Sequence, residues 1–99
     1  MFQTVVITGA TAGIGKETAR DLANRGAKVL ILARNERRGE DTVKELSEND
    51  VEVGQRVQFR SLDLGSLASV RECARGILES EQKIDILINN AGKDFVKQR

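Results

Sequence analysis

The sequence lacks histidine, tyrosine, tryptophan and proline, and it contains one cysteine, Cys73. A single cysteine excludes a disulfide bond within the chain and argues against a cysteine-bound metal cluster. This agrees with a reducing, cytoplasmic compartment. Because Cys73 falls within a helical pattern, we expect a small buried apolar side chain there rather than a reactive thiol.

Long apolar runs and an excess of one charge are also missing. The longest strongly apolar run, residues 29–33, is too short to span a bilayer. The first expected strand begins at Thr4, which leaves no room for a signal peptide. The formal net charge of +1 gives no reason to expect nucleic acid or an anionic membrane as a partner. With 99 residues, 39% hydrophobic and 31% charged, the chain is typical of one small soluble globular domain.

Four short apolar segments are expected to be strands. Residues 4–8 and 28–33 are rich in β-branched and apolar side chains without polar alternation, which is typical of parallel strands buried on both faces. Residues 56–62 are less apolar and are predicted to lie nearer a sheet edge. Residues 84–88 form the fourth segment.

Three amphipathic segments alternate with these strands, so the sequence predicts an α/β fold with a parallel sheet. The first ends at Gly26, a helix-ending glycine, and its apolar stripe consists of Ile14, Thr18, Ala19, Leu22 and Ala23. The second covers residues 36–48, with a loop expected at residues 49–54. The third follows Ser66, a predicted N-cap, and its apolar face consists of Leu67, Val70, Ala74 and Ile77.

A glycine-rich turn, residues 9–15, joins the first strand to the first helix. One glycine allows the tight turn, another a close backbone approach to a pyrophosphate, and the last a close packing of helix on strand. Free amide groups at the start of the helix then favour phosphates. A kinase-type phosphate loop is the rival interpretation, but Ala10 replaces its first glycine and Glu17 its magnesium-binding hydroxyl residue. The turn therefore predicts a dinucleotide site.

Three motifs in this order resemble those of the short-chain dehydrogenase/reductase family. Residues 8–15, TGATAGIG, match its TGxxxGIG pattern, and residues 89–92 match its NNAG motif. Asp63 and Leu64 stand where the family has an acidic residue that contacts the adenine ring. The amino-acid sequence of residues 14–19 and 32–35 is most similar to that of the retinol dehydrogenase branch.

The resemblance implies a partial Rossmann fold, an α/β fold with a four-stranded parallel sheet of order 3-2-1-4 and three helices. Residues 1–92 are then its dinucleotide-binding half and residues 93–99 a charged C-terminal tail. The crossovers place the first two helices on one face of the sheet and the third alone on the other. Apolar surface should stay exposed around the first and fourth strands, so self-association or pairing with a full-length relative is expected.

Arg34, the residue that ends the second strand, is predicted to select the cofactor. A carboxylate there binds the ribose 2′-hydroxyl of NAD, whereas an arginine accommodates the 2′-phosphate of NADP, so we expect NADP(H), with help from Arg37 and Arg38. Two alternatives stay open. Arg34 can be a solvated residue at a strand end, and Asp63 can be an N-terminal helix residue whose negative charge interacts favourably with the helix dipole. By resemblance, Asn89 steadies the central strand. The predicted cofactor site consists of Gly9, Thr11, Gly13, Ile14, Gly15, Arg34, Asn35, Asp63, Leu64, Asn90, Ala91 and Gly92.

The catalytic groups of the family have no counterpart in this sequence. Its members transfer hydride between nicotinamide and a carbinol or carbonyl carbon, using a tyrosine, a lysine four residues later and a serine, all after the fourth strand. Here Lys93 and Lys97 have no tyrosine to act on, so the chain alone is expected to be inactive. The first hypothesis is the NADP(H)-binding portion of a retinol-dehydrogenase-like oxidoreductase, truncated before its catalytic residues. The second is a non-catalytic dinucleotide-binding or interaction module that associates with a full-length relative.

Overall fold

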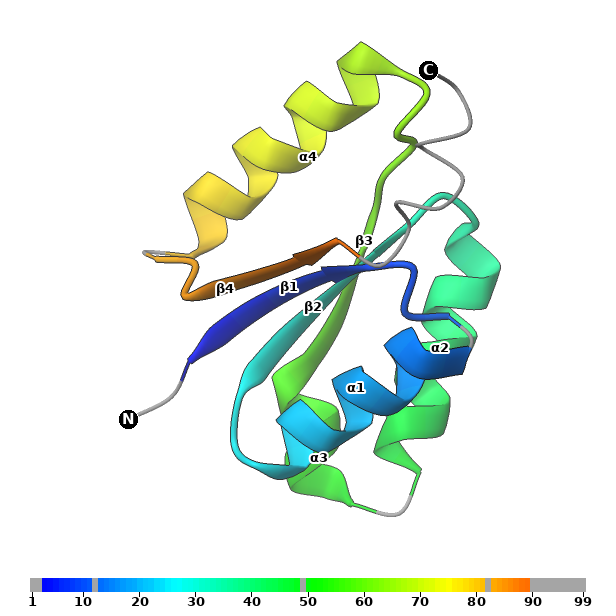
Figure 1. Ribbon diagram of the computed structural model, residues 1–99, viewed down its shortest axis with the longest axis vertical. Coiled ribbons are helices and arrows are strands. Elements are labelled where there is room, and N and C mark those ends of the chain that lie inside the picture. Colours follow the sequence, from blue (N-terminus) through cyan, green and yellow to red (C-terminus); the bar gives the residue numbers. More distant parts are fainter. Residues whose placement is uncertain (1–2, 12, 49, 82, 90–99) are drawn as a thin grey trace.

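The structure, a computed structural model, describes residues 3–11, 13–48, 50–81 and 83–89. In these residues the chain forms four strands and four helices, and the helices lie on the two faces of a single sheet (Figure 1). The strands are β1 (Thr4–Thr8), β2 (Lys28–Ala33), β3 (Val57–Ser61) and β4 (Ile86–Asn89). The helices are α1 (Gly13–Asn24), α2 (Glu36–Ser47), α3 (Val51–Arg56) and α4 (Leu67–Ser80).

The strands form one sheet in the order β3-β2-β1-β4, and each neighbouring pair is parallel. This confirms the predicted order, with β1 and β2 at their expected bounds. The less apolar β3 lies at one edge, as expected, and β4 at the other. Because all the strands run in the same direction, their carboxyl ends lie along a single edge of the sheet.

The helices cover the two faces of the sheet unequally. Figure 1 shows α1, α2 and α3 on one face and α4 alone on the other, as the crossovers predicted. Successive strand residues point to opposite faces, so Val5 and Ile7 join the core under the three helices while Val6 joins the core under α4. All three are nearly inaccessible to solvent, which explains why β1 carries no polar alternation.

Local signals fix where several elements start and stop. Ser66 caps α4, since its hydroxyl accepts a hydrogen bond from the backbone N–H of Ser69 at 3.2 Å. Gly26 has φ of 100°, a conformation that favours glycine, at the turn between α1 and β2. Both roles agree with the sequence analysis.

The prediction of three helices and a loop at residues 49–54 was wrong in one respect, because α3 occupies part of that segment. Asp50 caps this short helix, and its Oδ1 accepts the N–H groups of Glu52 at 2.9 Å and Val53 at 3.3 Å. Val53 is only 1% exposed, so burial adds to the cap. Gly54 indicated a loop in the sequence, but an added Cβ there would lie 2.9 Å from the Cβ of Ser47. The glycine thus permits a close helix contact.

The buried faces of α1 and α4 also differ from the predicted ones. Ile14 is 83% exposed, whereas Ala19, Leu22 and Ala23 of the predicted stripe do face the core, together with Gly15. Small side chains at this spacing let α1 approach the sheet closely. In α4 the fully buried residues are Cys73 and Ile77, with Val70 packed beside them, whereas Leu67 and Ala74 are exposed.

Cys73 lies on the buried face of α4, as expected for a small apolar residue. Burial disfavours the thiolate and raises the pKa of the Cys73 thiol. Over the residues that the structure covers, none of the helices has the length and apolar character needed to cross a bilayer.

The cap of α3 can be tested by replacing Asp50 with alanine. Asp50→Ala removes the acceptor for two helix amides and should lower the free energy of unfolding by about 1 kcal/mol. Urea denaturation followed by circular dichroism measures this change. Asp41→Ala is the matched control, because Asp41 is an exposed residue of α2. Equal stability of the two variants would contradict the assignment of α3.

Candidate functional site

The predicted site residues lie at the carboxyl edge of the sheet. Gly9 follows β1, Arg34 follows β2, and Asp63 comes two residues after β3. From β1 the chain crosses over to β2 on one side of β1, and after β3 it returns to form β4 on the other side of β1. Ligands of open parallel sheets bind at such a switch point, outside the carboxyl ends of the strands. The fold therefore brings residues from distant parts of the sequence to one edge.

The glycine turn has the backbone geometry that its sequence predicted. Gly9 has φ of 68° and Gly13 has φ of 60°, both in the left-handed region. An added Cβ at Gly13 would meet no atom within 4 Å, so open space lies above the start of α1. Gly15 is buried in α1 against the core. Two glycines thus shape the turn, and the third allows close packing.

The first amide groups of α1 have no acceptor within the helix. They follow Gly13 at the carboxyl end of β1, beside the open space described above. Their N–H groups and the positive end of the helix dipole favour an anion at this position. Thr11 lies in the turn and is partly exposed. The turn and the helix start together form a surface suited to a phosphate group.

A side-chain hydrogen bond joins the ends of β1 and β4. The Thr8 hydroxyl donates to Oδ1 of Asn89 at 3.0 Å, and the same two residues are register partners in the sheet. Thr8 is buried. The bond links β1 to β4 where both strands end at the site, which agrees with the steadying role expected for Asn89. Asn90, Ala91 and Gly92 lie outside the described residues.

Three arginines fall within residues 34–38, directly after β2. Arg34, Arg37 and Arg38 are all exposed. Within the described part of the chain, no carboxylate lies at ion-pairing distance from any of them, which is also true of Lys44, Arg56, Arg60 and Arg71. The described cations that do have acidic partners are Lys16, Arg20, Arg25, Lys28, Arg75 and Lys83. This cluster is therefore a local source of positive charge at the carboxyl edge.

Asn35 has a structural use that the sequence analysis missed. Its Oδ1 accepts the backbone N–H of Arg38 at 3.0 Å and caps α2. The signal was present in the sequence, because asparagine before a charged amphipathic segment is a common N-cap. Asn35 thus fixes the start of α2 next to the arginines.

Asp63 forms a tight turn between β3 and α4. Its Oδ1 accepts the N–H of Gly65 at 2.9 Å, and its own N–H donates to the hydroxyl of Ser69 at 2.8 Å. α4 begins at Leu67, so Asp63 precedes its cap and is not a residue of the first helical turn. Ser69 was not predicted as part of this region. Leu64, next to Asp63, is 37% exposed at the same edge.

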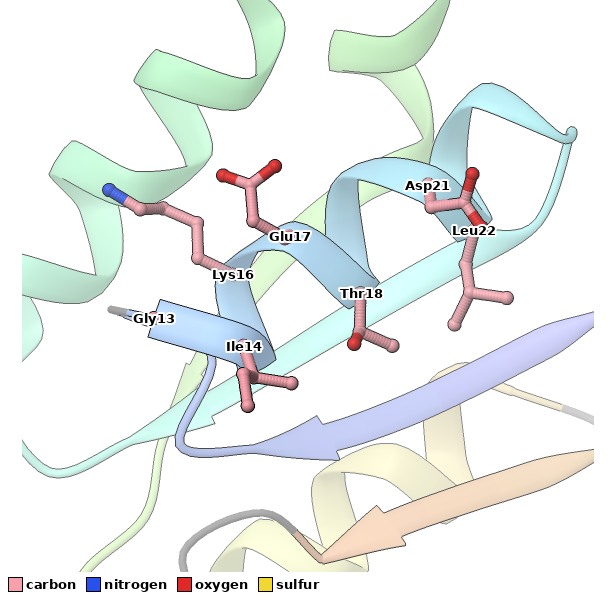
Figure 2. Close-up of a pocket in the computed structure, with 7 residues that line it drawn as sticks. All are labelled: Gly13, Ile14, Lys16, Glu17, Thr18, Asp21 and Leu22. Atoms are coloured by element: carbon pink, nitrogen blue, oxygen red, sulfur yellow. The ribbon is translucent and has the colours of Figure 1, made fainter.

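A shallow hollow of about 670 Å³ runs along α1 (Figure 2). Figure 2 shows Ile14, Thr18 and Leu22 on one flank of the helix, while Lys16 extends in another direction. The Lys16 ammonium lies 2.7 Å from Oε2 of Glu45 on α2, and this ion pair lowers the pKa of the Glu45 carboxyl. A kinase-type loop would direct this lysine to a phosphate, so its pairing with Glu45 supports rejection of that alternative.

No group of three or more acidic, histidine or cysteine side chains that could hold a metal occurs among the residues described. The chemistry that the edge offers is binding. It combines the first backbone amides of α1, a cationic cluster after β2, and a turn formed by the carboxylate of Asp63 beside a partly exposed leucine.

Comparison with known proteins gives consistent results. The model of a family described as short chain dehydrogenase matches residues 3–99. Human retinol dehydrogenase 12 is 48% identical over 90 residues, which cover 91% of this chain and 28% of that protein. The chain thus spans about a quarter of the length of such relatives.

Solved structures share the fold. Menthone neomenthol reductase from Mentha piperita is similar with a TM-score of 0.86 and 35% identity, over 91% of this chain and 31% of that one. An alcohol dehydrogenase from the archaeon Thermococcus sibiricus, complexed with 5-hydroxy-NADP, has a TM-score of 0.75 and 33% identity. That similarity covers 88% of this chain and 36% of the archaeal one.

The bond between the strand ends predicts the effect of Thr8→Val. Valine keeps the shape of threonine but leaves Oδ1 of Asn89 without this donor, so the free energy of unfolding should fall by about 1 kcal/mol. Amide hydrogen exchange in β4 should accelerate. Thr18→Val, on the surface of α1, is the matched control. If both variants exchange β4 amides at the wild-type rate, the bond does not hold this edge.

Proposed function

The chain belongs to the short-chain dehydrogenase family and is retinol-dehydrogenase-like, and from this membership we propose that it binds NADP(H) at the carboxyl edge of its sheet. Its Rossmann-like fold is that of nicotinamide-dependent oxidoreductases. The proposed ligand lies across β1, with its diphosphate at the start of α1 and its adenosine portion extending toward β2 and β3.

One observation carries the proposal: the glycine turn and the arginine cluster, which has no acidic partner among the described residues, follow two strands that pair side by side in the sheet. A dinucleotide needs amide donors for its diphosphate, and Gly9 and Gly13 shape the turn that leads into the first amide groups of α1. The 2′-phosphate of NADP needs a cation after the second strand, where Arg34 stands without an acidic partner among the described residues. A guanidinium can form two parallel hydrogen bonds with such a phosphate.

The remaining site residues have roles by family membership. We assign the adenine ring to Asp63 and Leu64, which form the turn after β3. Asn90, Ala91 and Gly92 follow β4 and are assigned to the nicotinamide side of the cofactor. At its nicotinamide ring, NADPH would supply a hydride and NADP⁺ would accept one, and this chain contributes the groups that bind and orient the dinucleotide.

In this proposal, the reduction of a carbonyl or the oxidation of an alcohol is carried out only by a protein that also has the groups for proton transfer. The chain contains no tyrosine, so the family's general acid has no counterpart in it. We therefore propose that the chain alone binds the cofactor without turnover.

A second candidate function is an interaction module that associates with a full-length relative. Exposed apolar side chains on the α4 side of the molecule favour it, since Leu67 is 65% exposed and Leu87 of β4 is 68% exposed. Formation of a complex between the chain and a full-length retinol dehydrogenase, measured by size-exclusion chromatography, distinguishes this function from cofactor binding alone.

Cofactor selection is tested with Arg34→Asp. Loss of a charge-assisted hydrogen bond to phosphate should weaken NADPH binding roughly ten- to a hundredfold. NADH binding should be kept or strengthened, because the aspartate supplies a carboxylate for the ribose 2′-hydroxyl. Calorimetric titration with both dinucleotides measures the two affinities. Arg71→Asp makes the same charge change on an exposed position of α4 and should alter neither affinity. Equal affinity of the unmutated chain for NADPH and NADH would overturn the proposal.

Turnover by the isolated chain is a separate test. Mixed with NADPH and retinal, the chain should oxidise no more NADPH than the uncatalysed mixture, because no tyrosine is present to protonate the carbonyl oxygen. A full-length retinol dehydrogenase serves as the positive control. Steady NADPH consumption proportional to the concentration of the chain would show that another group performs this step.

A further inference from the structure

The first turn of α2 rests on an aromatic ring of β3. The buried residues of α2 are Gly39, Thr42 and Leu46, so Gly39 is the first point along the helix that is buried. An added Cβ at Gly39 would lie 2.1 Å from Cε1 of Phe59 and 2.2 Å from its Cδ1. The ring of Phe59 therefore packs directly against the backbone of α2.

This contact explains a glycine inside a helix. Glycine is less favourable than alanine at such a position, and a glycine retained there usually has a packing reason. Phe59 belongs to the strand next to β2 and packs against the core beneath α1, α2 and α3. Only a residue without a side chain lets the helix approach the ring this closely. We call the contact between Gly39 and Phe59 the ring seat.

The ring seat is connected to the arginine cluster by a short series of hydrogen bonds. The N–H of Gly39 donates to the carbonyl of Asn35 at 2.9 Å. Oδ1 of Asn35 accepts the N–H of Arg38, and the carbonyl of Arg38 accepts the hydroxyl of Thr42 at 2.8 Å. The segment from the cap to the seat is thus one well-bonded helical turn, and Arg34 immediately precedes it.

We propose that the ring seat of Gly39 and Phe59 determines cofactor specificity, because it sets the distance between the first turn of α2 and the sheet and thereby positions Arg34 for the 2′-phosphate. This inference rests on the proposed function. Gly39 and Phe59 are positioning residues and touch no part of the cofactor themselves. A methyl group at residue 39 would have to retreat from 2.1 Å to the 3.4 Å at which ordinary contact with the ring begins. That retreat moves the cap of α2 away from the sheet and thereby changes the orientation of Arg34, which joins the cap to the end of β2.

The test compares dinucleotide affinities in three variants of the whole chain. In Gly39→Ala, the ratio of NADPH to NADH affinity should fall about tenfold, because a hydrogen bond to phosphate is worth at least that much. In Gly39→Ala/Phe59→Leu the smaller side chain makes room for the methyl group, and the wild-type ratio should return. Phe59→Leu alone should lower stability but keep the ratio, because residue 39 is still glycine and the smaller side chain of leucine still lets α2 lie close to the sheet.

Gly76→Ala is the matched control. Gly76 is also a helical glycine, in α4, and its added Cβ would lie 2.9 Å from an Nη of Arg60, the flexible end of a side chain. This substitution should leave both affinities unchanged. The chain has no tryptophan or tyrosine, so the fluorescence of NADPH can be followed without emission from those residues.

The outcomes separate the inference from the proposed function. If the unmutated chain does not prefer NADPH, the proposed function fails before the variants are compared. If it prefers NADPH and Gly39→Ala lowers both affinities by the same factor, the seat is only structural and the inference is overturned. If Gly39→Ala does not fold, the double variant decides, since loss of the NADPH preference there also overturns the inference.

Discussion

The parallel pairing of β1 with both β2 and β4 is the constraint on which the candidate site depends. Ile7 pairs with Ile31 on one side and Ile88 on the other, and it is completely buried. Because the three strands run in the same direction, the glycine turn, Arg34 and Asn89 must emerge at the same edge. Every binding role assigned above follows from this shared edge.

The parts of the fold that could be predicted are those whose residues are buried on both sides. β1 and β2 have continuous apolar runs that leave no other stable placement in water, and their bounds agree with the sequence. α3 could not be predicted in this way. Gly54 by itself indicates a loop. The segment is helical in the fold because Val53 is buried, and the missing side chain of Gly54 lets α3 lie close to Ser47 of α2. Those are tertiary effects that six residues do not encode locally.

The faces of the helices were harder to predict for a related reason. A stripe of apolar residues indicates which side of a helix is buried only when large side chains make the contact. In α1 the buried residues are the small Gly15, Ala19 and Ala23, with Leu22 packed beside them, whereas Ile14 was wrongly placed in the buried stripe. The ring seat was missed because Gly39 and Phe59 meet only after α2 and β3 have packed. The sequence therefore indicated the backbone groups of the site more completely than the contacts that support them.

The central claim is that a dinucleotide lies across the carboxyl edge between the glycine turn and the arginine cluster. Titration of the isotope-labelled chain with NADP⁺, followed by nuclear magnetic resonance, tests it most directly. The account predicts that the backbone amide signals of Gly9, Gly13 and Gly15 and the side-chain signal of Arg34 shift together with one saturation curve. Shifts confined to the hollow along α1, at Thr18 and Leu22, or the absence of any shift, would contradict it.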